Sequence, residues 1–190
     1  MIISVRGTNG SGKSTLVRGL IAASKSAPRK FYGVLGPRMT EALGLKVQGV
    51  KKPVYTLGSY HVESGGADQI QPYDLILELL EKYAALGHVV FEGVLVSSSY
   101  GRVGRLMEQW GQQAVMAFLA TSLEDCLKNV QKRRDGRGDK RPFDPANATS
   151  KYHSIVKSRV KIIEEQKVRV VDLNPTTGLK QVVALLREAI

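Results

Sequence analysis

Eight residues near the amino end have the types and spacing of a phosphate-binding loop. Residues 7–14 read Gly-Thr-Asn-Gly-Ser-Gly-Lys-Ser and follow a short apolar run that ends at Val5. Three glycines let successive backbone N–H groups turn toward one anion, and Lys13 adds a positive charge for the β- and γ-phosphates of a nucleotide. The Ser14 hydroxyl suits Mg²⁺, which prefers oxygen ligands and binds together with substrate phosphates. The residues predicted to bind ATP and Mg²⁺ are Gly7, Thr8, Asn9, Gly10, Ser11, Gly12, Lys13, Ser14 and Thr15.

An acidic side chain after a second apolar segment is a candidate to assist the metal. Residues 88–91 read as a buried strand, and Glu92 follows it directly. Because ligands bind at the carboxyl ends of parallel strands, Glu92 is expected near the phosphates, where it would hold Mg²⁺ or its water shell. It could instead act as a general base, or pair structurally with Arg102 or Arg105. Arg102 is itself a candidate catalytic residue, in a hydroxyl-rich segment suited to acceptor recognition.

Residues 57–70 form a glycine-rich segment between an expected strand and an expected helix. Asp68 in this segment is a candidate base, because phosphoryl transfer to a hydroxyl needs an acid side chain that orients the oxygen and takes its proton. The alternative is a cap for the helix expected over 71–86. Tyr60 and Tyr100 are candidates to stack on an unstacked base, or else residues at the edge of the core.

A basic segment follows in the second half of the chain. The net charge is +11, and residues 128–161 hold eleven Lys or Arg, three Asp and no Glu, a local charge of +8. Such a patch suits a polyanion, either ATP alone or ATP with a nucleic acid. Arg133, Arg134 and Arg137, with glycines among them, predict a mobile lid over about 131–150 whose arginines close on the transferring phosphoryl group. A solvated basic loop is the alternative.

The elements that must position these residues alternate along the chain. A chance glycine-rich turn would need neither the strand before the loop nor the helix after it. The alternation predicts an α/β fold of the P-loop NTPase type, with a parallel sheet flanked by helices on both faces and a basic lid, as in nucleotide kinases. The expected strands are 2–6, 45–50, 54–58 (a possible hairpin with 45–50), 88–91, 114–119 and 168–173, and the expected helices are 15–24, 71–86, 104–112, one that follows Ser122 as its cap, 149–166 and 178–189.

Length and composition limit the classes of protein to consider. The 190 residues fit a single domain over 1–190 with a full core. No apolar run is long enough to span a bilayer, so no membrane partner is expected. The single cysteine, Cys126, permits no internal disulfide and reads as a small core residue, and the expected compartment is a reducing cytoplasm. The oligomeric state is left open.

With these pieces in place, the chain resembles the bacteriophage P-loop kinases that phosphorylate 5-hydroxymethyluracil in DNA during thymine hypermodification. The resemblance rests on residues 5–15, 57–60, 65–70 and 91–93 with 100–102, within roughly the first 110 residues. It implies ATP as the donor, the 5-hydroxymethyl group of a modified pyrimidine in DNA as the acceptor, and the host cytoplasm as the location. The strong positive charge agrees with a polymeric DNA substrate, and a base inside a duplex must be made reachable, for example by flipping.

Two other functions fit the same residues. A nucleoside or nucleotide monophosphate kinase would share the expected fold and lid. An ATP-dependent DNA-binding switch would bind or hydrolyse ATP without transferring phosphate to an acceptor. Incubation with labelled ATP distinguishes the three functions. A DNA kinase labels hydroxymethyluracil DNA, a nucleotide kinase labels free hydroxymethyl-dUMP, and a switch labels neither.

Overall fold

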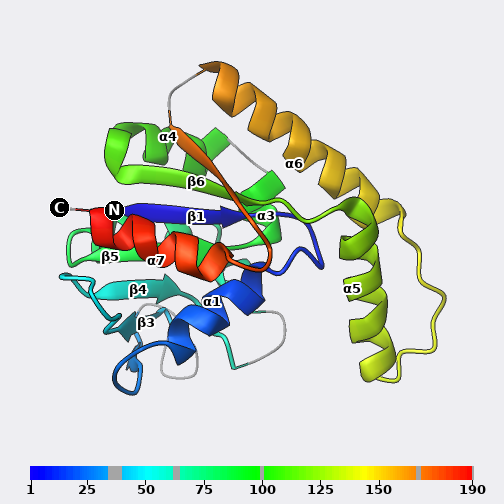
Figure 1. Ribbon diagram of the computed structural model, residues 1–190, viewed down its shortest axis with the longest axis horizontal. Coiled ribbons are helices and arrows are strands. Elements are labelled where there is room, and N and C mark those ends of the chain that lie inside the picture. The colour runs from blue at the N-terminus through cyan, green and yellow to red at the C-terminus, as the bar shows by residue number, and fades with distance from the viewer. Residues whose placement is uncertain (34–39, 62–64, 99–100, 166–167, 190) are drawn as a thin grey trace.

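The computed structural model describes residues 1–33, 40–61, 65–98, 101–165 and 168–189 (Figure 1). Strands and helices alternate along most of this chain. Their bounds are β1 Ile2–Arg6, α1 Lys13–Ala22, β2 Arg29–Phe31, β3 Ala42–Leu45, β4 Val54–Leu57, the 3₁₀ helix η1 Ala67–Gln69, α2 Asp74–Ala84, β5 His88–Glu92, α3 Val94–Ser98, α4 Gly101–Gln109, the 3₁₀ helix η2 Gly111–Gln113, β6 Ala114–Leu119, α5 Leu123–Gly136, α6 Ala146–Glu165, β7 Arg169–Leu173 and α7 Gly178–Glu188.

The strands form one sheet in the order β2-β3-β4-β5-β1-β6-β7. The pairs from β4 to β7 are parallel, whereas β3 runs antiparallel to both β2 and β4. The sheet is therefore mostly parallel rather than wholly so. The hairpin expected before residue 58 is present, but its first strand ends at Leu45 instead of beginning there. The reason is a turn at Gly49 that ends the extended backbone. Gly49 has a positive φ of +77°, and the Val50 amide donates a hydrogen bond to the Val47 carbonyl.

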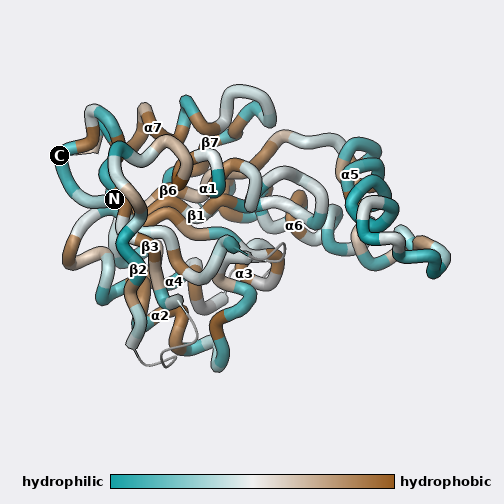
Figure 2. Tube along the Cα trace, turned by 90° about the horizontal axis from the view of Figure 1, so that it is seen from below, coloured by the Kyte–Doolittle hydropathy of each residue, from teal (hydrophilic) through white to brown (hydrophobic). Residues whose placement is uncertain are grey.

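Each face of the sheet has its own apolar core. One core joins β1 and β5 to the buried sides of α1 and α7, and the other joins the sheet to α2, α4 and α6. Alternate residues of β1 serve the two cores, since Ile2 belongs to one and Ile3 to the other. Hydropathy colouring accordingly shows the central strands β1 and β6 as apolar (Figure 2). The expectation of helices on both faces is confirmed.

The central position of β1 decides which loops meet. β1 lies between β5 and β6, with Val5 opposite Glu92 and Arg6 opposite Phe118. Because these strands are parallel, the segments that follow them emerge at the same edge of the sheet. The glycine-rich loop, residues 7–14, thus lies between the carboxyl ends of β5 and β6.

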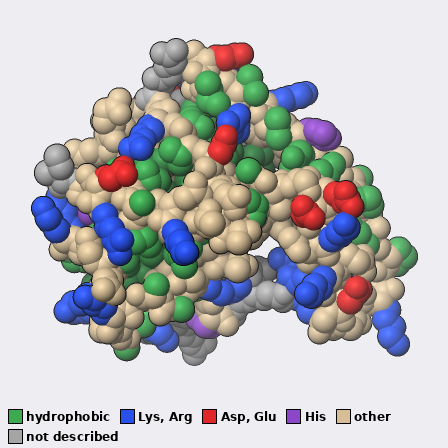
Figure 3. Space-filling view, in the orientation of Figure 1, with side chains coloured by type: hydrophobic (Ala, Val, Ile, Leu, Met, Phe, Trp, Pro, Cys, Tyr) green, Lys and Arg blue, Asp and Glu red, His purple; other side chains and the backbone are tan. Residues whose placement is uncertain are grey.

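Helix α5 and residues 137–145 form an arm that extends beyond this edge of the sheet (Figure 1). The arm is mostly hydrophilic (Figure 2), and the surface is hollowed between the arm and the rest of the molecule (Figure 3). Ser122 caps α5 as expected, because its hydroxyl accepts a hydrogen bond of 3.0 Å from the Asp125 amide.

Two smaller expectations can also be compared with the structure. Cys126 is completely buried, and burial raises the pKa of its thiol to about 11, which fits a core residue rather than a nucleophile. Within the described parts of the chain, no helix combines the length and apolarity that crossing a bilayer requires.

Candidate active site at the carboxyl edge of the sheet

The glycine-rich loop wraps around the carbonyl oxygen of Thr8. The Ser11 hydroxyl donates to that oxygen over 2.8 Å, and the Lys13 ammonium donates to it over 2.9 Å. Gly10 has a positive φ of +78°, and a Cβ there would lie 2.1 Å from the Cys126 carbonyl oxygen, so only glycine fits. Gly12, at a φ of +96°, faces open space instead. The loop is therefore closed on its α5 side and open where helix α1 begins.

Four polar contacts from distant segments hold this loop in place. The Thr121 hydroxyl donates to the Ser11 carbonyl (2.8 Å), and the Asn129 amide donates to the Gly10 carbonyl (2.9 Å). The Thr8 hydroxyl donates to the Ala148 carbonyl of α6 (3.2 Å), and the Gly7 amide donates to the Ser97 hydroxyl of α3 (3.3 Å). No local pattern predicts these supporting contacts, because each partner lies 90 or more residues away in the chain.

Glu92 meets the loop through Ser14. The Ser14 hydroxyl donates to Glu92 Oε1 over 2.8 Å, and the Glu92 side chain is only 2 % exposed. Burial raises the pKa of the Glu92 carboxyl above its ordinary value, and the charge of Lys13 opposes that shift. Burial also lowers the pKa of Lys13, while Glu92 and Asp68 oppose that change. Lys13, Ser14 and Glu92, the groups predicted to act on phosphate and metal, thus lie together, and the charges of the buried Lys13 and Glu92 are coupled.

Asp68 lies next to this cluster, on η1. Its Oδ2 accepts a hydrogen bond of 2.6 Å from the Val94 amide, the first residue of α3, and its Oδ1 packs against Gly93. Helix α2 begins only at Asp74 and has no side-chain cap, so the reading of Asp68 as the cap of that helix is wrong. Instead, Asp68 ties η1 to the end of β5, which places two carboxylates side by side at the sheet edge.

Gly66 leaves room for the Glu92 carboxylate. It has a φ of +82°, and a Cβ at this position would lie 2.6 Å from Glu92 Oε1 and 2.7 Å from the Glu92 carbonyl oxygen. The close approach explains why the segment expected to form the rim of the site contains a glycine here.

Replacing Gly66 with alanine is expected to displace the Glu92 carboxylate from Ser14. The backbone strain should cost about 1–3 kcal/mol of folding free energy, and the rate of phosphate transfer should fall by more than that stability loss explains. The measurement is kcat at saturating substrate together with a thermal melt. Gly136→Ala is the matched control, because a Cβ at Gly136 meets nothing within 4 Å; equal rates in the two variants would contradict this role of Gly66.

Tyr60 is a core residue rather than a stacking platform. Its side chain is 7 % exposed and belongs to the core beside α1, where its hydroxyl has no hydrogen-bond partner among the described residues. Burial raises the pKa of the Tyr60 phenol well above its ordinary value, and the nearby Glu92 charge adds to the shift. The second candidate for stacking, Tyr100, lies outside the described residues.

The predicted arginines differ in where they lie. Arg133, on the last turns of α5, is close enough to Lys13 for its charge to lower the pKa of that ammonium further, after burial. Arg134 is engaged within the arm, where it pairs with Asp139 at 3.2 Å and donates to the Arg141 carbonyl at 2.7 Å. Arg137 follows the end of α5.

Asp139 stabilises the arm through ion pairs with Arg134 and Arg141. The guanidinium of Arg141 donates to both of its carboxylate oxygens at 2.9 Å, which holds the pKa of Asp139 well below its usual range. Arg102 lies on α4, but its side chain is outside the described part of the structure.

An open cavity of about 390 Å³ adjoins the loop on the α6 side. Thr8 and Ser11 of the loop, Thr121 after β6, and Tyr152 and Ile155 of α6 are among its lining residues. It combines hydroxyl groups with apolar and aromatic surface next to the expected phosphate site, the mixture typical of small-molecule pockets.

The fold and this site define an α/β protein with a glycine-rich loop, a buried lysine and two carboxylates at the carboxyl edge of a mostly parallel sheet. The chain is 35 % identical over 154 residues to a 5-hmdU DNA kinase of Pseudomonas phage PaMx11, which covers 80 % of this chain and 79 % of that relative. It is 29 % identical to a 5-hmdU DNA kinase of Pseudomonas phage M6, across 97 % of this chain and 96 % of the relative. No protein-family model matches the chain. The chain belongs to the family of phage 5-hmdU DNA kinases.

Proposed function

We propose that the protein is an ATP-dependent phosphotransferase of the P-loop type that phosphorylates the hydroxymethyl group of 5-hydroxymethyluracil in DNA. Membership of the 5-hmdU DNA kinase family supports the reaction and the substrate. The observation that carries the proposal in this chain is the contact of Ser14, in the glycine-rich loop, with the buried Glu92 carboxylate at 2.8 Å, beside Lys13 and Asp68. A phosphate-binding loop that meets a carboxylate cluster at one sheet edge is suited to phosphoryl transfer.

The donor nucleotide is assigned to the open side of the loop. The backbone amides of the loop and of the first turn of α1 would bind the phosphate oxygens, and the helix N-terminus favours their negative charge. Lys13 now donates to the Thr8 carbonyl and would exchange this neutral partner for the phosphates. Burial lowers the pKa of Lys13, and the negative charge of bound phosphates would oppose this change. Phosphate binding would therefore favour the charged ammonium.

The oxygen atoms of Ser14 and Glu92 fit Mg²⁺. A hydroxyl and a carboxylate 2.8 Å apart are hard oxygen donors, and Mg²⁺ in kinases is held by one or two such groups together with substrate phosphates. When bound, the metal would neutralise charge on the phosphates. The chain's own part is to hold Glu92 in place, with Gly66 packed against it, and to favour its ionised form through the Lys13 charge and the Ser14 hydrogen bond, which oppose the effect of burial on its pKa.

Asp68 is assigned to the acceptor. The hydroxymethyl oxygen attacks the γ-phosphorus, forming a new O–P bond while the bond to the leaving ADP oxygen breaks, and the hydroxyl proton passes to the Asp68 carboxylate. The Val94 amide orients that carboxylate through Oδ2. Arg133 and Arg137, together with the arm, would close over the transferring group and stabilise its charge, and Arg134 would hold the arm in shape through Asp139.

The test uses γ-labelled ATP with three acceptors: DNA containing hydroxymethyluracil, free hydroxymethyl-dUMP, and ordinary thymine DNA. The expected result is label only on the hydroxymethyluracil DNA. Label on the free nucleotide in preference to DNA would instead indicate a nucleotide kinase, and ATP hydrolysis without any labelled acceptor would indicate a switch.

The pH dependence of the reaction should reveal Glu92. Its carboxyl must be ionised to act, and burial raises its pKa, so kcat/KM should rise with pH through a value above that of an ordinary glutamate. In the Glu92→Gln variant, the rise of the residual kcat/KM with pH should be absent or should occur at lower pH. The profile is measured between about pH 4.5 and 8 for both proteins; identical acid limbs would exclude Glu92 as the group that titrates.

A further inference from the structure

Helix α6 has an exposed outer face that the proposed catalytic steps leave unused, and this face carries polar residues beside the exposed apolar residues Val156, Val160 and Ile163. Its inner face packs into the core through Ala148, Ile155 and Ile162. Four exposed residues follow one another at helical spacing on the opposite side, at positions i, i+3, i+4 and i+7. These are Ser150, His153, Ser154 and Lys157.

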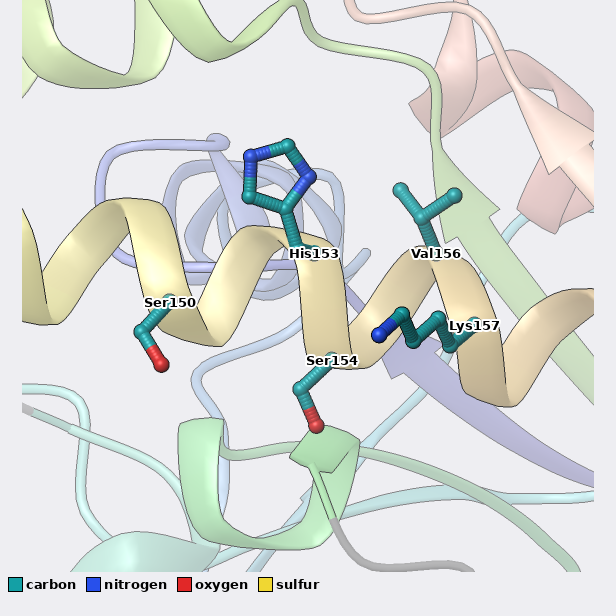
Figure 4. A pocket seen from close by; sticks show the side chains of 5 residues that line it. All are labelled: Ser150, His153, Ser154, Val156 and Lys157. Atoms are coloured by element: carbon teal, nitrogen blue, oxygen red, sulfur yellow. The ribbon is translucent and has the colours of Figure 1, made fainter.

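These four residues and Val156 border one open hollow of about 810 Å³, where His153 and Val156 point to the side of the helix opposite Ser150 and Ser154 (Figure 4). Ser150 and Ser154 point to the same side of the helix, and the Lys157 side chain runs back along the helix toward Ser154 (Figure 4). Hydroxyl and ammonium groups are among the side-chain groups that contact the phosphates of nucleic acids. Ser150 and Lys157 are separated by a rise of about 10 Å along the helix, enough for consecutive phosphates of one strand.

The charge of the helix suits the same partner. Helix α6, Ala146–Glu165, contains Lys151, Lys157, Arg159 and Lys161, and its two acidic residues, Glu164 and Glu165, are the last two of the helix. Arg159 pairs with Asp172 across to β7, and Lys161 lies 3.7 Å from Glu165 one turn further on. Among the residues that the structure describes, no ion pair occupies Lys157, so its ammonium is available to a ligand.

The position of α6 connects this face to the reaction centre. The Ala148 carbonyl, two residues before Ser150 and five before His153, accepts the hydrogen bond from Thr8 of the glycine-rich loop. Helix α3 packs against α6, and its first residue, Val94, is the one that orients Asp68. The amino-terminal part of α6, which carries these four residues, therefore lies next to both the glycine-rich loop and the segment that orients Asp68.

We propose that Ser150, His153, Ser154 and Lys157 bind the sugar–phosphate backbone of the substrate DNA and hold it while the target base occupies the acceptor site. The inference rests on the proposed DNA kinase function, which it extends by assigning the surface that receives the polymer. Contacts to phosphate position the strand without reading its sequence, so this face gives affinity for DNA in general.

The test compares wild-type protein, Lys157→Gln, and Lys157→Gln combined with Ser150→Ala and Ser154→Ala. The control is Lys180→Gln, which removes an equally exposed lysine from α7 on the other face of the sheet. Dissociation constants are measured for a labelled hydroxymethyluracil oligonucleotide and for ATP across a series of salt concentrations. Steady-state kinetics are measured with the same DNA.

Loss of the Lys157 contact should weaken DNA binding about fivefold at 0.1 M salt and reduce the slope of log K against log salt by about 0.7–0.9. The triple variant should be weaker still, with raised KM for DNA, unchanged kcat and unchanged ATP affinity. Equal slopes and DNA affinities in wild type, Lys157→Gln and Lys180→Gln would overturn the proposal. Because binding is measured apart from transfer, a wild-type protein that binds DNA through this face without phosphorylating it would overturn the proposed function alone.

Discussion

Replacement of Lys13 with alanine should lower the rate of phosphate transfer on the order of 10³-fold or more, because no other ammonium lies within the loop. The loss should appear in both ATP affinity and kcat, since the charge acts on phosphates in the ground state and in the transition state. Transfer is measured as label incorporated into hydroxymethyluracil DNA, and ATP affinity by calorimetry.

The fold should survive this substitution. Lys13 makes a hydrogen bond to the Thr8 carbonyl, but its charge is buried, and burial lowers its pKa. The lost hydrogen bond and the lost attraction to the buried Glu92 carboxylate destabilise the fold, whereas the relieved burial of the Lys13 charge stabilises it, so the net change in unfolding free energy should stay within about 3 kcal/mol. Lys46→Ala, at an exposed site beside β3, is the control. Wild-type turnover by the folded Lys13→Ala protein would remove the loop from the mechanism.

The second large effect separates the two carboxylates. Asp68→Asn should slow transfer by about 10²–10⁴-fold, the usual contribution of a general base, with ATP affinity little changed. Asparagine can still accept the hydrogen bond from the Val94 amide through its side-chain oxygen, so the position of η1 should be kept. Single-turnover rates at saturating ATP and DNA measure the chemical step directly.

Glu92→Gln is the comparison for this experiment. If Glu92 holds Mg²⁺ with Ser14, its amide variant should need a higher Mg²⁺ concentration for half-maximal rate and recover activity as Mg²⁺ is raised, whereas Asp68→Asn should not recover. Asp68→Ala adds a structural control, because it also removes the contact to α3 and should cost about 0.5–2 kcal/mol of stability. Recovery of Asp68→Asn by Mg²⁺, without recovery of Glu92→Gln, would exchange the two roles.

Much of the local structure follows from the sequence. Apolar runs and helical periodicity predict most strands and helices to within a few residues, and Ser122 is the cap that its side chain predicts. The short edge strand β2 was not predicted, and β3 was placed several residues late. Both belong to the antiparallel edge, where strands of three or four residues carry too little periodicity to be recognised.

The candidate site was predictable as a set of residues but not as an arrangement. Ser14 and Glu92 were both expected near Mg²⁺, yet their hydrogen bond depends on β1 lying next to β5. Asp68 was weighed as a cap for α2, which follows it in sequence, whereas in the structure it binds the amide of Val94, 26 residues further on. Tyr60 was weighed as a stacking residue, and only the packing against α1 shows that it is buried.

The sequence by itself predicts a phosphate-binding loop, because glycine conformations, a lysine and a hydroxyl at fixed spacing act through a continuous stretch of backbone. It also determined the alternation of strands and helices, which depends on periodicity within each segment. Only the tertiary structure decided that β1 lies between β5 and β6, that Gly66 makes room for Glu92, and that α6 reaches the loop at Thr8. These contacts join segments far apart in the chain, so they depend on the order and register of the whole sheet rather than on any local pattern.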